Sequence, residues 1–208
     1  SPRFTTYWWS YPNVFNARWK KIELLGESVD DAIGEAFDKT AKLIGLGYPG
    51  GARIEELAKY GDENYFKLPK PLLNDPTFNF SFSGIKTHIN LLTKKNKIDD
   101  NFRKNISSSF QKTITEIIIS KIEKVLEFLN TKKISLKSTS IVGGVANNFY
   151  IRRNLENLFE KKNIELYYPI KEMMSDNAAM IAWACIKNYS NKNADIFFKP
   201  NPRLKIAL

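Results

Sequence analysis

Apolar residues recur every three or four positions in several stretches of the chain, a spacing that predicts amphipathic helices. One such face lies between 29 and 44. We expect Ser28 to cap this helix through a capping-box pair with Asp31. The pattern over 99–130 predicts one long helix or two helices in series. Shorter helices are predicted near 54–58, from 83 onward, over 147–162 and over 175–189.

Short apolar runs between these helices predict strands. The runs at 22–25, 139–142 and 164–168 fit short strands, and the phenylalanines between 78 and 82 alternate with polar residues as in a half-buried strand. Helices dominate the middle of the chain, whereas strands alternate with helices in its second half. The pattern therefore favours an α/β domain.

Composition places the chain among globular proteins. It has 208 residues, of which 43% are hydrophobic and 26% charged, and it lacks the ~20 consecutive apolar residues that a membrane span needs. Cys185 is the only cysteine, so no internal disulfide forms, and we interpret it as a small core residue. Without the layout of a signal peptide at the N-terminus, we expect no membrane association and a cytoplasmic location.

The charge balance leaves two interpretations open. The chain carries 32 basic and 22 acidic residues, for a formal net charge of +10. Such an excess is typical of proteins that bind a polyanion such as nucleic acid. Lysine makes up most of the excess and asparagine is abundant, which is equally typical of a gene from an AT-rich genome.

The strongest local signal is a buried strand that runs into Gly143 and Gly144 and then into a helix. Glycines there let a phosphate or ribose approach the backbone, and the helix N-terminus offers unpaired N–H groups. Asn148 follows in the same loop, where its amide either binds a ligand or solvates the first helical turn. A plain tight turn is the alternative interpretation of the glycines.

Further polar residues have a structural and a functional interpretation. Asp176 precedes the last predicted helix, either as a helix-terminus charge or as an oxygen ligand for a divalent metal. Asp38 shares a helix face with two other acids, which is usually a solvated face. Gly51 closes a Pro-Gly-Gly turn that either reverses the chain or admits a ligand. His88 has no metal-binding partner nearby in the sequence, so we interpret it as structural.

Taken together, these motifs resemble one family. The segments that carry the resemblance occur at 26–39, 45–51, 80–87, 143–152 and 175–182. Their order and spacing are similar to those of the tRNA N6-adenosine threonylcarbamoyltransferases, the TsaD family, formerly called glycoproteases. The resemblance covers about 21–203.

The resemblance implies a fold, a reaction and partners. The fold would be the actin-like, sugar kinase and Hsp70-type ATPase α/β fold, with an incomplete first lobe. The reaction would transfer threonylcarbamoyl from threonylcarbamoyl-AMP to N6 of adenosine 37 of tRNA, which makes the family an acyltransferase. Asp38, Gly51 and Asn148 would contact the adenylate part of the substrate. A TsaB-like paralogue and a TsaE-like ATPase would be protein partners.

The resemblance also implies one divalent metal, Fe(2+) or Zn(2+), with Asp176 as its carboxylate ligand. The family takes two further ligands from a His-x-x-x-His motif, and this chain has one histidine. We therefore expect the chain to be a C-terminal portion that alone binds the metal weakly or not at all.

Residues 1–20 differ from the rest of the chain and hold three of its four tryptophans. Read one nucleotide later, the codons at 8–12 can encode Gly-Gly-His-Thr-Gln, a substrate-binding loop of the family at this distance from Gly26. We interpret 1–20 as an atypical, out-of-frame segment. Residues 21–208 would form the C-terminal portion, with a helical insertion at about 84–131 and α/β elements at about 138–190.

Two alternatives to the enzyme remain. The chain could be an inactive truncated relative that acts as a protein-binding module in the same complex. A metallopeptidase would match the old family name, but the chain has no His-Glu-x-x-His motif.

Overall fold

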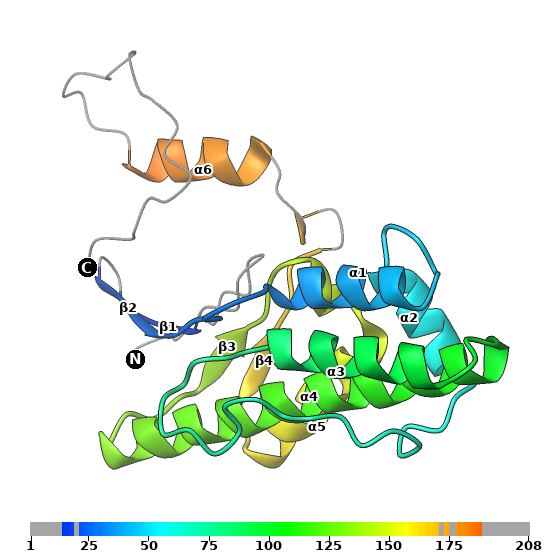
Figure 1. Cartoon of the computed structure of the whole chain (residues 1–208). Helices are drawn as coiled ribbons and strands as arrows, with labels where there is room; N and C mark the ends of the chain where they lie inside the picture. Colours follow the sequence, from blue (N-terminus) through cyan, green and yellow to red (C-terminus); the bar gives the residue numbers. More distant parts are fainter. Residues whose placement is uncertain (1–13, 19–20, 171–172, 175–177, 189–208) are drawn as a thin grey trace.

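The computed structural model describes residues 14–18, 21–170, 173–174 and 178–188 (Figure 1). Strands β1 (Val14–Arg18) and β2 (Lys21–Gly26) pair as an antiparallel hairpin. β2 confirms the predicted strand at 22–25, whereas β1 lies in a segment for which the pattern predicts no element. Beyond β2, the chain enters a largely helical body.

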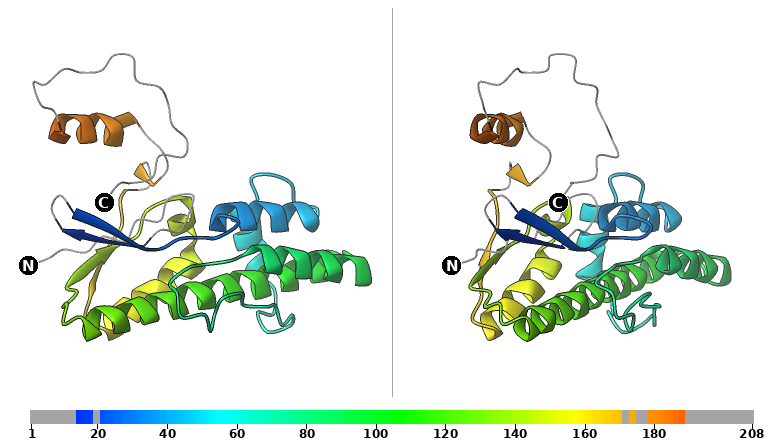
Figure 2. Two further views of the ribbon diagram at one scale, coloured as in Figure 1. Left: turned by 60° about the vertical axis from the view of Figure 1, so that its left-hand side comes forward. Right: turned by 90° about the vertical axis from the view of Figure 1, so that its left-hand side faces the viewer.

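Helix α4 (Asp100–Thr131) forms the centre of this body. Helices α1 (Ile33–Leu43), α2 (Gly51–Ala58) and α3 (Ser83–Lys95) lie over it in both views of Figure 2. Asp99 caps α4 by accepting a hydrogen bond from the Phe102 backbone N–H at 2.8 Å. α4 is one continuous helix, which decides between the two predicted arrangements.

The core follows from the apolar faces of these helices. In α1, Phe37 packs edge-on against Phe110 of α4, with ring centroids 4.9 Å apart. The other fully buried side chains of the core come mainly from α2, α3 and α4: Ile54, Ile85, Ile89, Ile106, Ile114 and Ile117.

The second half of the described chain forms a β-α-β unit. Strands β3 (Ser138–Ser140) and β4 (Glu165–Tyr167) pair in parallel, with Thr139 opposite Leu166, and α5 (Phe149–Lys161) connects them. The turns after α4 and α5 lead into the N-terminal ends of β3 and β4. Because both strands run in the same direction, the loop after β3 leaves from the opposite end of the sheet. The chain is thus a mixed α/β structure with a small parallel sheet.

Two sequence predictions about local structure are wrong. The helix predicted from Ser28 begins at Ile33, with Ala32 at its N-cap; the Ser28 hydroxyl instead donates to the Asp31 backbone carbonyl at 2.6 Å. The segment 78–82 is a loop that makes one isolated parallel bridge, between Phe80 and Ser28. Phe80 is fully buried because this loop is packed into the core.

The long connection between α2 and α3 is attached to α4 by two lysines. The Lys121 ammonium donates to the Thr77 carbonyl at 2.8 Å, and Lys124 donates to the carbonyls of Leu73 and Asp75 at 2.7 and 2.9 Å. Lys121 is only 1% exposed. These bonds satisfy backbone carbonyls that no helix or sheet pairs.

Helix α6 (Ala178–Asn188) follows β4 and lies away from the α4 body in Figure 1. Cys185 is exposed, so its interpretation as a core residue is wrong. Ile181, Trp183 and Ile186 are also more than 60% exposed. Among the described helices, none combines the length and apolar character that crossing a membrane requires.

Candidate functional site

Three of the predicted site segments lie next to one another. Gly34, on the first turn of α1, faces the loop after β3: a Cβ atom at Gly34 would lie 3.9 Å from a methyl group of Val145. Gly50 lies against the same helix, where a Cβ would come within 2.4 Å of the Ala41 Cβ atom. Any larger residue at position 50 would push the turn away from α1, so glycine fits this close approach.

Asp38 connects α1 to that turn. Its carboxylate accepts a hydrogen bond from the Gly50 backbone N–H at 2.7 Å, directly before Gly51 at the start of α2. The other two acids of the predicted face have a different partner, since the Lys39 ammonium lies 2.5 Å from Asp31 and 2.8 Å from Glu35. Hydrogen bonds to these two carboxylates raise the pKa of Lys39 above its ordinary value.

The loop after β3 leaves room beside Gly144. Gly143 adopts a φ of 96°, in the left-handed region that favours glycine. A Cβ at Gly144 would meet nothing within 4 Å. The backbone then makes a short 3₁₀ turn over Gly144–Asn147, in which the Ala146 N–H donates to the Gly143 carbonyl at 3.0 Å.

Asn148 ends this loop and caps α5. Its side-chain oxygen accepts from the Ile151 N–H at 2.9 Å, and its side-chain nitrogen donates to the Gln111 side-chain oxygen on α4 at 2.8 Å. Asn148 is 7% exposed and Gln111 is 4% exposed. Asn148 therefore solvates the first turn of α5, as one of its two predicted roles requires, and its amide is fixed inside the protein.

The N-terminus of α5 is less free than the sequence suggests. Besides Ile151, the Phe149 N–H is paired, because it donates to the Glu55 carboxylate of α2 at 2.6 Å. A carboxylate at this end of a helix interacts favourably with the helix dipole. A phosphate that approached these N–H groups would first have to displace Glu55.

A residue that the sequence analysis missed, Asp30, joins the loop before α1 to the segment before α3. Its carboxylate accepts from the hydroxyls of Ser81 and Ser83 and from the backbone N–H groups of Asp31 and Phe82. Burial raises the pKa of Asp30, but these hydrogen bonds outweigh it and hold the pKa below 3.8. The repeated serines in the 80–87 motif are the signal for this contact.

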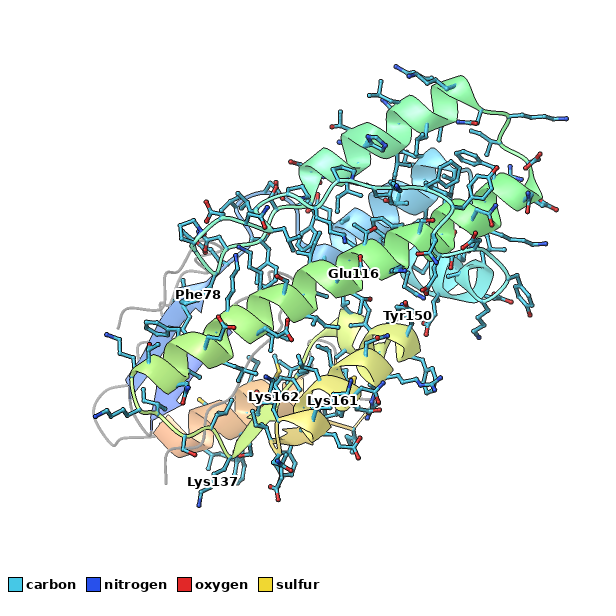
Figure 3. The ribbon with its side chains drawn as sticks, turned by 90° about the horizontal axis from the view of Figure 1, so that it is seen from below. Phe78, Glu116, Lys137, Tyr150, Lys161 and Lys162 are labelled. Atoms are coloured by element: carbon cyan, nitrogen blue, oxygen red, sulfur yellow. The ribbon has the colours of Figure 1, made fainter. Side chains whose placement is uncertain are left out.

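A second polar contact lies where α5 packs along α4 (Figure 3). The Tyr150 hydroxyl donates to the Glu63 carboxylate at 2.8 Å, and the Lys112 ammonium donates to the same carboxylate at 3.0 Å. Burial, followed by the hydrogen bond to Glu63, raises the pKa of Tyr150. The Tyr150 hydroxyl therefore stays protonated to a higher pH than an ordinary tyrosine.

The predicted metal ligand cannot be placed. Asp176 lies outside the described residues, so its position relative to Asp38, Gly51 and Asn148 remains a prediction. Within the described ranges, no group of three His, Cys, Asp or Glu side chains is arranged to hold a metal ion. His88 is partly buried on α3, and its structural role stays a prediction.

Comparison with known proteins connects this geometry to a family. The family model described as TsaD, tRNA N6-adenosine threonylcarbamoyltransferase, matches residues 13–183. Proteins named tRNA N6-adenosine threonylcarbamoyltransferase from Thermosipho africanus, Rickettsia rickettsii and Wigglesworthia glossinidia brevipalpis are 45%, 42% and 39% identical over 89%, 83% and 88% of the chain.

These alignments cover 55%, 51% and 53% of the three relatives, so the chain spans about half the length of the curated relatives it matches. The family match begins at residue 13, just before β1, and extends into α6. It includes all the motif segments on which the resemblance rests. The chain belongs to the TsaD family of tRNA N6-adenosine threonylcarbamoyltransferases.

Proposed function

We propose that the protein transfers the threonylcarbamoyl group of threonylcarbamoyl-AMP to N6 of adenosine 37 in tRNA. The observation that supports this proposal best is the meeting of α1, the Gly50–Gly51 turn and the Gly143–Gly144 loop. Gly34 and Gly50 allow the close approaches among these segments. The Gly50–Gly51 turn and the Gly143–Gly144 loop, two segments of the family motifs, thus each pack against α1, which carries a third.

The proposed chemistry needs alignment more than a reactive side chain. The N6 amine of adenosine forms a bond to the carbonyl carbon of the mixed anhydride, the bond from that carbon to the AMP phosphate oxygen breaks, AMP leaves as the phosphate anion, and the proton from N6 passes to solvent water. Residues that bind the adenylate can supply much of the rate enhancement by orienting the anhydride toward the N6 amine. We assign this binding role to Asp38, Gly51, Gly143, Gly144 and Asn148, and we name no general base.

The remaining expectations belong to the whole protein. We propose that it has the two-lobed actin-like fold and works with a TsaB-like paralogue and a TsaE-like ATPase. Fe(2+) or Zn(2+), with Asp176 as a ligand, would polarise the acyl-phosphate side of the substrate. The described residues of this chain do not make a metal site, so no step above depends on the metal.

One observation favours a second candidate, an inactive relative that binds another protein in the same complex. The apolar residues Ile181, Trp183 and Ile186 of α6 are exposed. Exposed apolar residues of this size are typical of a surface that another protein covers. A binding module would keep this surface and show no transfer of threonylcarbamoyl.

Transfer by the full-length protein, with threonylcarbamoyl-AMP and tRNA, separates the two candidates. We expect the wild type to modify tRNA and the Asp176→Ala variant to lose at least about tenfold in rate and most of its bound iron or zinc. Glu123→Ala, at an exposed position on α4, is the control and should match the wild type. Undiminished modification by Asp176→Ala would remove the metal role, and an inactive wild type would favour the binding module.

A further inference from the structure

Asn148 is held by two hydrogen bonds from different parts of the fold. Its oxygen accepts from Ile151 within α5, and its nitrogen donates to Gln111, which lies 37 positions earlier on α4. The amide of asparagine can make four hydrogen bonds, two as donor and two as acceptor. In the described part of the chain, these two contacts use one acceptor site and one donor N–H of the Asn148 amide.

The two contacts also fix the direction of the amide. Rotation of the amide by 180° would point its NH₂ group at the Ile151 N–H and its oxygen at the Gln111 oxygen, so both hydrogen bonds would be lost. The helix cap alone fixes the oxygen, but the Gln111 contact fixes the nitrogen and the plane of the amide. Because both residues are at most 7% exposed, water competes little for these bonds.

We propose that Gln111 is a positioning residue that orients Asn148 toward a nucleotide bound at the Gly143–Gly144 loop. This inference rests on the proposed function, because the nucleotide is the adenylate part of the proposed substrate. Asn148 ends the same loop, four residues after Gly144, beside which a Cβ atom would meet nothing within 4 Å. A ligand there meets an amide whose free N–H and free lone pair already point in set directions, which lowers the cost of ordering it.

Gln111 reaches Asn148 from a rigid element. It lies in the interior of α4, and its own backbone carbonyl accepts from the Thr115 hydroxyl at 2.7 Å. Phe110, its neighbour in the sequence, is fully buried against α1. The Gln111 side chain is therefore anchored in the core and extends to the loop after β3, so that α4 and the loop keep a fixed relation.

Three variants of the full-length protein test the proposal, with AMP as the probe and its dissociation constant measured by titration calorimetry. Gln111→Met keeps the length of the side chain and removes the acceptor oxygen. Gln111→Glu keeps an acceptor oxygen whether or not its carboxyl is protonated. Thr113→Val is the control for a polar change in the α4 core, since the Thr113 hydroxyl is buried and donates within its own helix, to the Ser109 carbonyl.

We expect Gln111→Met to weaken AMP binding about tenfold, the equivalent of one lost hydrogen bond. Gln111→Glu and Thr113→Val should stay within about threefold of the wild type. Urea unfolding of all three variants shows whether each is folded under the assay conditions. A purely structural role would make Gln111→Met and Thr113→Val alike in AMP affinity once both are folded.

Two outcomes would overturn the proposal: AMP binding by folded Gln111→Met that equals the wild type, or failure of Gln111→Glu to retain binding when it is folded. If Gln111→Met does not fold, Gln111→Ala, which also removes the acceptor oxygen, takes its place in the comparison with Thr113→Val. Wild-type protein that binds AMP without transferring threonylcarbamoyl would contradict the proposed function and leave the Gln111 test intact. Wild-type protein that does not bind AMP would contradict both.

Discussion

Asp38 carries two separable properties, a negative charge and a hydrogen bond to the Gly50 N–H. The hydrogen bond holds the turn that leads into α2 against α1. The charge would meet the ribose or base of a bound nucleotide if the proposed function is right. Substitutions that remove one property at a time distinguish a structural role from a binding role.

We expect Asp38→Ala to lower the free energy of unfolding by about 1–2 kcal/mol, because the partly buried Gly50 N–H loses its charged acceptor. Asp38→Asn keeps an acceptor oxygen, so it should cost less than about 1 kcal/mol. Both variants should weaken AMP binding about tenfold if the carboxylate contacts the nucleotide. Urea unfolding and calorimetric titration measure the two effects, and normal AMP affinity in Asp38→Asn would contradict the binding role.

At the scale of elements, Asp30 connects the segment before α1 to the segment at the start of α3, which is distant in the sequence. Four donors converge on one carboxylate, and three of them come from the segment at the start of α3. The parallel bridge between Ser28 and Phe80 lies beside this contact. Asp30 therefore holds α1 and α3 in a common orientation.

The lowered pKa of Asp30 predicts acid sensitivity. Its pKa in the folded protein lies below the 3.8 of the unfolded chain, so its contribution is complete above pH 3.8 and is lost as the pH falls through the folded-state value. Asp30→Ala should lower the free energy of unfolding at pH 7 by about 2–3 kcal/mol and flatten this acid dependence. Urea unfolding between pH 3 and pH 7 provides the measurement.

Asp100→Ala is the matched control for this experiment, because Asp100 is largely exposed and, among the described residues, pairs with Arg103 on the protein surface. An exposed ion pair contributes little to stability. Its acid dependence should follow that of the wild type. An Asp30→Ala variant with the same acid dependence as the wild type would show that the carboxylate does not hold the two segments together.

For the whole molecule, the parts predicted correctly from the sequence are those that depend on local pattern. The face between 29 and 44 and the long run over 99–130 locate α1 and α4 because helical spacing recurs within a few residues. The sequence pattern also predicts the start of α3 at Ser83 and the junction of β3, its loop and α5. Each of these features is set by neighbours in the chain.

The remaining features depend on contacts between distant residues. The alternating phenylalanines at 78–82 imitate a strand because a docked loop also buries alternate side chains. The contacts of Asn148 with Gln111 and of Phe149 with Glu55 span 37 and 94 positions. A periodic pattern of apolar residues therefore cannot predict them. Cys185 lies on an apolar helix whose exposure depends on what packs beside α6, which its own sequence does not specify.

The net charge of +10 belongs to no single element, because lysines occur along the whole chain. A tRNA-binding surface and a biased base composition predict different preferences among polyanions. In the first case, contacts between lysines and phosphates release counterions from the nucleic acid. In the second case, the positive charges repel one another and bind tRNA no better than other polyanions.

We therefore expect the full-length protein to bind tRNA with an affinity that falls as salt rises. Three neutralised phosphates would cost about 40-fold between 50 and 200 mM salt, given a slope of about −0.9 per phosphate. Filter binding across this range measures the slope, and heparin at matched charge is the control polyanion. Affinity for tRNA that equals that for heparin at every salt concentration would contradict a tRNA surface and attribute the lysine excess to base composition.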